Sequence, residues 1–86
     1  MAREDNAAVQ RVLLLILILA PLRRGETLVT LIREVSDRTG RKWSDRTIRR
    51  DLHLLQRCRL VERHGEGELS RWYWRGVGNL AKAFEK

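Results

Sequence analysis

The pattern of hydrophobic and polar positions divides the chain into three helical stretches and one alternating stretch. Residues 6–20 form the first predicted helix, with apolar side chains on every side. Residues 28–38 form the second and residues 45–58 the third, each with one apolar stripe at helical spacing. After residue 59 the period changes to two, so we expect a hairpin of two strands within residues 60–75. Residues 76–86 are predicted to be a tail with a final helical turn over residues 79–86.

Residues suited to helix ends stand at the predicted boundaries. Asn6 is placed to cap the first helix, and Pro21 disfavours helical geometry at the residue before it. Thr27 is placed to cap the second helix, and Gly40 suits the left-handed position just past its end. Ser44 is the predicted N-cap of the third helix. These signals place the connection between the second and third helices at residues 40–43, which is longer and more basic than the usual short turn.

The first predicted helix has two apolar faces. One face holds Val9, Val12, Leu13, Ile16 and Ala20. The opposite face carries Arg11 and four apolar residues, Leu14, Leu15, Ile18 and Leu22. A helix that is apolar all round should be buried all round, and a domain this small covers only one side. We therefore predict a homodimer whose interface is formed by Leu14, Leu15, Ile18 and Leu22.

The apolar run of the first helix, residues 12–22, allows two further interpretations. It is shorter than the roughly 20 apolar residues that a membrane span needs. Its length fits the apolar core of a secretory signal peptide, but Glu4 and Asp5 neutralise the leader and Arg23 and Arg24 stand where a cleavage site would be. We favour a cytoplasmic protein in which this segment is a core and dimer helix.

Composition and charge narrow the choice of partner. The 86 residues suffice for one domain and carry a net charge of +7, with 18 Lys and Arg against 11 Asp and Glu. Residues 23–59 hold a net +6, residues 1–22 are neutral and residues 60–86 hold +1. Charge gathered in one region is typical of a nucleic-acid contact. The single cysteine excludes an internal disulfide and suits a reducing cytoplasm.

The third predicted helix carries most of the concentrated charge. Ile48, Leu52 and Leu55 form its apolar face, and the opposite face carries Arg46, Arg50, His53 and Arg57, with Arg49 beside them. A solvated surface face is the alternative for any one of these residues. A surface helix usually mixes charges of both signs, however, and this stripe contains no acid.

Together these elements predict an α+β fold that is mainly α with a small β-hairpin. The whole chain, residues 1–86, would be a single winged helix-turn-helix domain with a three-helix core and a two-stranded wing. In the motif Ser44–Leu52, followed by Leu54-Leu55 and by Leu60–Glu62, the sequence resembles DeoR-type regulators and the N-terminal domains of WYL-domain regulators. The resemblance covers residues 27–63. It implies sequence-specific binding of double-stranded DNA by a bacterial or phage transcription regulator, usually a repressor.

The stripe then yields candidate DNA contacts. Side chains expected to read base edges are Arg46, Thr47, Arg49, Arg50 and His53. Side chains expected to bind phosphates are Arg41, Lys42, Ser44, Arg57, Arg63, Arg71 and Arg75. Glu66 and Glu68 stand at the hairpin turn, where phosphates would repel them, so we do not expect the wing tip to enter the minor groove.

Other chemistry is sparse in the sequence. His53, His64 and Cys58 do not have metal-ligand spacing, and Cys58 is predicted to lie toward the edge of the core. Trp72 and Trp74 share one strand face and are expected to close the core. No catalytic constellation is recognisable, so we expect no enzyme, no cofactor, no metal and no small-molecule effector. The alternative to a DNA-binding regulator is a winged-helix adaptor or complex subunit that binds a protein partner through its apolar first helix.

Overall fold

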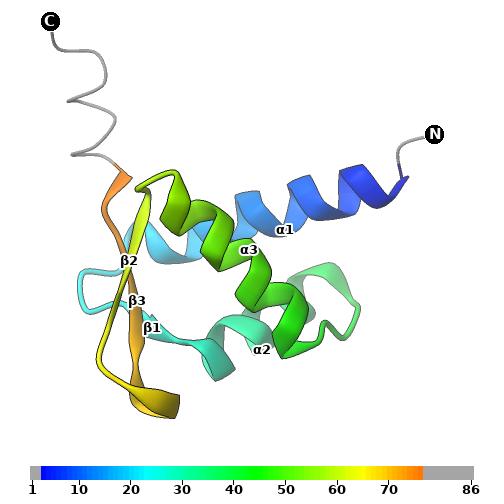
Figure 1. Ribbon diagram of the computed structural model, residues 1–86. Helices are drawn as coiled ribbons and strands as arrows, with labels where there is room; N and C mark the ends of the chain where they lie inside the picture. The colour runs from blue at the N-terminus through cyan, green and yellow to red at the C-terminus, as the bar shows by residue number, and fades with distance from the viewer. Residues whose placement is uncertain (1–2, 77–86) are drawn as a thin grey trace, which may run out of the picture.

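The computed structural model describes residues 3–76 and confirms the predicted α+β class (Figure 1). The elements in chain order are α1 (Arg3–Leu19), β1 (Glu26–Thr27), α2 (Leu28–Thr39), α3 (Asp45–Arg57), β2 (Val61–His64), the 3-10 turn η1 (Gly67–Leu69) and β3 (Arg71–Trp74). Three helices followed by a β-hairpin wing form the topology of a winged helix. The predicted tail lies almost wholly outside the described residues.

The predicted ends of α2 and α3 are confirmed. The hydroxyl of Thr27 accepts a hydrogen bond from the backbone N–H of Thr30, and that of Ser44 accepts one from the N–H of Thr47 at 3.1 Å. Gly40 ends α2 with φ at 71°, in the left-handed region. The start of α1 was predicted wrongly: the helix begins at residue 3, so Asn6 lies inside it. Acidic residues are favourable in a first helical turn, which fits an earlier start.

The sheet has three strands, one more than predicted. β3 is the central strand and pairs antiparallel with β2 on one side and β1 on the other. β1 is only two residues long, and its residue Thr27 takes extended geometry as the N-cap of α2. Gly25 lets the chain approach β3 here, because it has φ of 71° and an added Cβ would lie 2.7 Å from the carbonyl oxygen of Trp72.

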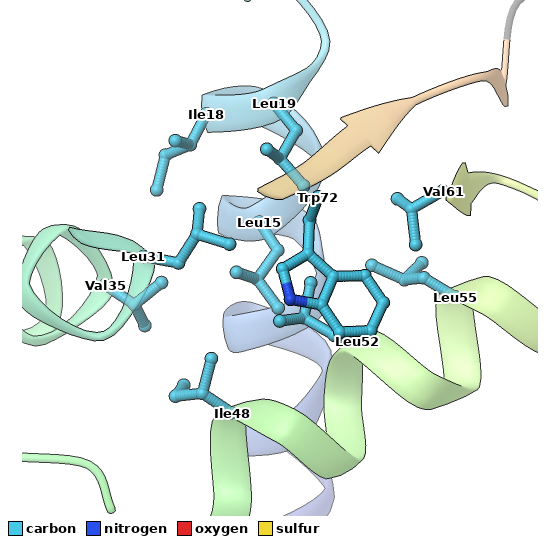
Figure 2. Close-up of a cluster of buried hydrophobic side chains, with 10 residues drawn as sticks. All are labelled: Leu15, Ile18, Leu19, Leu31, Val35, Ile48, Leu52, Leu55, Val61 and Trp72. Atoms are coloured by element: carbon cyan, nitrogen blue, oxygen red, sulfur yellow. The ribbon is translucent and has the colours of Figure 1, made fainter. Parts of the chain in front are cut away.

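The core lies where the three helices meet the sheet (Figure 2). Trp72 projects from β3 toward Leu15 of α1 and Leu52 of α3, and it is 3% exposed. This burial confirms that Trp72 closes the core, while Trp74 is only partly buried against it. The buried apolar residues are Leu15, Ile18, Leu19, Leu31, Val35, Ile48, Leu52, Leu55, Val61 and Trp72. The predicted apolar face of α3 is therefore correct.

The buried side of α1 differs from the predicted one. Leu15 and Ile18, two of the predicted interface residues, are buried in the core of the domain, which contradicts their place in an outer interface, while Leu14 and Leu22 are partly buried against that core. Of the predicted core face, Val12 and Ile16 are partly buried against the core, and Val9, Leu13 and Ala20 are exposed. The outer face instead carries Val9, Leu13 and Leu17, each more than half exposed. Arg11 explains the error. It lies on the face that was predicted to meet a second subunit, but it is 5% exposed and paired with Asp51 of α3 within the domain.

Cys58 also differs from expectation, because it is exposed and does not lie at the core edge. The last residue of α3 is Arg57, and Cys58 is the cap residue that follows it. The chain then leaves the helix axis through Arg59, whose φ is 63°. Cys58 itself keeps near-helical geometry, and its N–H donates to the carbonyl oxygen of Leu54 at 3.1 Å.

Among residues 3–76, no helix combines the length and the apolar content that a membrane span requires.

Candidate nucleic-acid interface

The face of α3 opposite the core is a continuous basic surface. Ile48, Leu52 and Leu55 are buried, so the helical period directs the other face to solvent. Four residues of that face, Arg46, Arg50, His53 and Arg57, are exposed as predicted, and Arg49 beside them is exposed too. We call these five residues the basic face.

Acidic residues neutralise little of the basic face. A nitrogen of Arg49 lies 3.5 Å from a carboxylate oxygen of Asp45, and both side chains are more than half exposed. Exposed pairs of this kind contribute well under about 1 kcal/mol, so Arg49 can leave Asp45 for a stronger anion. Within the described residues, Arg46, Arg50 and Arg57 form no ion pair. The face is therefore available to an anionic partner.

A groove flanks α3 on the side of α1. It is lined by Ala7, Ala8, Arg11, Arg41, Trp43, Thr47 and Arg50. The guanidinium carbon of Arg41 lies 4.2 Å from the centroid of the Trp43 ring, a cation–π distance. The indole N–H of Trp43 donates to the hydroxyl of Thr39 at 2.8 Å, which fixes the ring under Arg41. The structure thus brings the predicted phosphate ligand Arg41 beside the predicted base reader Arg50.

A second groove flanks α3 on the side of the wing. Its basic lining is Arg49 and His53 of α3 and Arg63 of β2, and Trp72 contributes to its apolar part. Two carboxylates, Asp45 and Glu68, line it as well. The His53 ring lies 5.8 Å from the Trp72 ring, centroid to centroid. Arg63 donates from Nε to the buried hydroxyl oxygen of Ser70 at 3.0 Å, which orients its guanidinium. Arg63 therefore stands across this groove from the basic face.

The other two wing arginines lie on the opposite side of the sheet. Neighbouring residues of a strand alternate between faces, so Arg71 and Arg75 share the face of Tyr73 and not that of the buried Trp72. Arg71 donates to the carbonyl oxygen of Gly25 at 3.2 Å. Arg75 lies 3.0 Å from a carboxylate oxygen of Glu62. The structure thus separates these two predicted phosphate ligands from α3.

Glu62 is the acid that organises this outer face of the wing. It accepts hydrogen bonds from His64 at 3.1 Å and from Arg75 at 3.0 Å. These bonds, with that from His64 the stronger influence, lower the pKa of Glu62. The charge of Arg75 is accordingly matched within the wing.

The remaining predicted contacts lie at the connection between α2 and α3. Lys42 is exposed. Ser44 and Thr47 bond to one another through their hydroxyls at 3.0 Å, and Ser44 also caps the helix. The hydroxyl of Ser44 therefore spends its one proton on Thr47, while the hydroxyl proton of Thr47 is free to donate to a partner.

Two residues of this site escaped the sequence analysis. Trp43 lay in the predicted connection without a role, and Arg11 was named only as a member of the predicted dimer face. The signal for Arg11 was its position inside a long apolar run, because a charge there requires a buried partner. Asp51, next to the basic stripe, was the available acid.

The tip of the wing is acidic, as the sequence indicated. Residues 65–70 form the connection between β2 and β3, and Glu66 and Glu68 are exposed there. Leu69 is 86% exposed beside them.

Among the described residues, no group of three potential ligands could hold a metal ion. Comparison with protein-family models, with characterised proteins and with solved structures finds no match to this chain.

Proposed function

We propose that the protein binds double-stranded DNA in a sequence-specific manner by placing α3 in the major groove. The observation that carries the proposal is the basic face, with its exposed arginines at helical spacing on one side of α3. An α-helix fits the major groove of B-DNA, which is about 12 Å wide. Guanidinium groups make the commonest specific contact there, with O6 and N7 of guanine.

The two grooves beside α3 support this docking. A helix in the major groove has one phosphate backbone on each side. Arg41 lines the groove toward α1, and Arg63 lines the groove toward the wing. We assign one backbone to each groove. Arg46, Thr47, Arg49, Arg50 and His53 then remain as candidate base contacts between the two backbones.

The proposed role is that of a small transcriptional regulator, more specifically a repressor that occludes its operator in the cytoplasm. The resemblance of residues 44–52 to DeoR-type and WYL-domain regulators supports this role. Glu68 of the acidic wing tip lines the groove toward the wing, so a phosphate backbone in that groove would lie nearer to Arg63 than to Glu68.

We further propose a homodimer formed through the exposed stripe Val9, Leu13 and Leu17 of α1, in place of the predicted interface. These residues recur every four positions and carry no charge, so they offer an uncharged, exposed stripe to the same stripe of a second copy. A two-fold dimer would recognise an inverted repeat with half-sites about one helical turn, or a multiple of it, apart. The same stripe also favours the alternative function, an adaptor that docks a larger protein.

Selection from a library of random duplexes tests the main proposal. We expect an enriched motif with inverted-repeat symmetry. Arg46→Ala and Arg50→Ala should each lower affinity for that motif by about 1–3 kcal/mol and relax selection at one position. Arg33→Ala is the matched control, since it removes one exposed charge from α2. Recovery of no motif, with both α3 variants binding random duplexes as the wild type does, would contradict sequence-specific recognition and favour the adaptor.

The salt dependence of binding tests the assignment of the backbones. Arg63→Ala should reduce the slope of log K against log salt by about 1, because one phosphate contact is lost. Arg75→Ala should leave that slope unchanged, since Arg75 lies on the outer face with Glu62. Equal losses in both variants would show that the wing meets DNA by its other face.

A further inference from the structure

One ion pair in the structure joins α1 to α3 inside the protein. Arg11 Nε lies 2.7 Å from one carboxylate oxygen of Asp51, and Arg11 Nη2 lies 3.4 Å from the other. The two side chains are 6% and 7% exposed. The planar guanidinium therefore faces both oxygens of the carboxylate, which fixes direction as well as distance.

The same guanidinium also touches the connection between α2 and α3. Its carbon lies 4.5 Å from the centroid of the Trp43 ring. Trp43 is in turn held by Thr39 through its indole N–H and by Ser36, whose hydroxyl accepts the backbone N–H of Trp43 at 3.2 Å. Arg11 thus contacts α3 through Asp51 and the connection that precedes α3 through Trp43. Trp43 is in turn bonded to the last turns of α2.

Stability alone does not explain such a pair. Burying two charges removes their hydration, and apolar side chains of similar volume are often as stabilising or more so. Apolar contacts tolerate small rotations and slides, however, whereas a two-point charged contact does not. We propose that Arg11 and Asp51 are positioning residues that set the rotation of α3 on the domain and thereby the register of the basic face on DNA. This inference rests on the proposed DNA binding, and neither residue needs to touch DNA.

The geometry makes α3 sensitive to this pair. Asp51 directly follows the candidate base reader Arg50 in the same helix. A rotation of about 20° moves atoms at the outer helix radius of about 6 Å by roughly 2 Å. Most N–H···O hydrogen bonds have donor–acceptor distances of about 2.7–3.2 Å, so a shift of this size breaks contacts to base edges. Contacts to phosphates suffer less, because charge attraction falls off slowly with distance.

The test replaces the ion pair with apolar side chains of similar size, Arg11→Met together with Asp51→Leu. A selected duplex and a scrambled duplex of the same composition are the two probes, and cooperative thermal unfolding is the check on folding. We expect the double variant to fold. The readout is the ratio of its affinities for the two duplexes, so a loss of affinity shared by both duplexes does not count. The preference of the double variant for the selected duplex should fall about 10- to 100-fold, which corresponds to the loss of one bidentate base contact. A folded double variant that keeps the wild-type preference overturns the inference.

A matched control removes the exposed pair between Glu34 and Arg38 of α2, whose atoms lie 3.5 Å apart. The double variant Glu34→Leu, Arg38→Met should leave the preference unchanged, and an equal fall there would also overturn the inference. If the double variant Arg11→Met, Asp51→Leu does not fold, Arg11→Lys takes its place. This substitution keeps the positive charge but loses the two-point contact, and it should lower the preference for the selected duplex severalfold. An unchanged preference in folded Arg11→Lys counts against positioning.

The two proposals fail differently. A wild-type protein with no preference for any duplex overturns the proposed function and this inference with it. A wild type that discriminates, alongside a double variant that discriminates equally well, overturns the positioning role alone.

Discussion

Breaking the Arg11–Asp51 pair from one side should cost far more stability than removing it altogether. Asp51→Leu leaves the Arg11 guanidinium buried without its anion, and Arg11→Met leaves the Asp51 carboxylate buried without its cation. Loss of one partner from a buried pair costs about 3–5 kcal/mol, whereas exchange of both for apolar groups is often neutral or stabilising. The two single effects should therefore be strongly non-additive.

The size of this effect is large for so small a domain. At roughly 0.05–0.15 kcal/mol per residue, 86 residues give a free energy of unfolding of about 4–13 kcal/mol. Each single variant would then lose about a quarter or more of it. With a urea m-value of about 1 kcal/mol/M, the unfolding midpoint should fall by about 3–5 M. If the wild-type midpoint is lower than this, the single variants should be unfolded without urea.

Equilibrium unfolding in urea, followed by tryptophan fluorescence, measures all four proteins of the cycle. Trp72 is buried in the core and reports its opening. We expect a coupling free energy of at least about 3 kcal/mol, because the double variant regains what each single variant loses. Single variants that cost less than about 1 kcal/mol each, or a double variant whose loss equals the sum of the two, would refute the reasoning.

Three further outcomes follow from the structure. Gly25→Ala should destabilise the fold more than Gly40→Ala, because both have φ of 71° but only at Gly25 would the new Cβ collide with the carbonyl of Trp72; equal urea midpoints would contradict this. Leu13→Glu should leave thermal unfolding of the domain intact while abolishing dimers in sedimentation, since this side chain is 54% exposed; an unchanged dimer would place the interface elsewhere. Because the pKa of Glu62 is lowered in the folded protein, its charged form stabilises the fold at any pH above the ordinary glutamate pKa. This stabilisation is lost as the pH falls through the pKa that Glu62 has in the folded protein. Stability measured from pH 7 down to pH 3 should therefore fall less steeply in Glu62→Gln, and identical slopes would dismiss the effect.

The helix-turn-helix was predictable because each of its boundaries is a local event. Thr27, Gly40 and Ser44 act on neighbouring backbone groups, so their roles can be identified without knowledge of the rest of the chain. The core face of α3 follows from the helical period in the same way. The basic face was therefore defined before any tertiary contact was known.

The parts that were missed depend on partners far away in the sequence. Arg11 and Asp51 are 40 residues apart, and only their meeting decides which side of α1 is buried. β1 exists because Glu26 and Thr27 pair with Trp72 and Arg71 of β3. A strand of two residues is too short to show an alternating pattern in the sequence. Arg63 lies on one face of the sheet and Arg71 and Arg75 on the other, and only the tertiary fold decides which of these faces lies toward α3.

The strand order has a consequence for how the protein is made. β3 is the central strand of the sheet, yet it is the last element in the described part of the chain. Until residues 71–74 leave the ribosome, neither β1 nor β2 has its hydrogen-bonding partner, and Trp72 cannot fill the core. The three helices can collapse earlier, but the nascent domain keeps an open core and two unpaired strands during that interval. Completion of the fold during synthesis should therefore be a single late event that closes wing and core together.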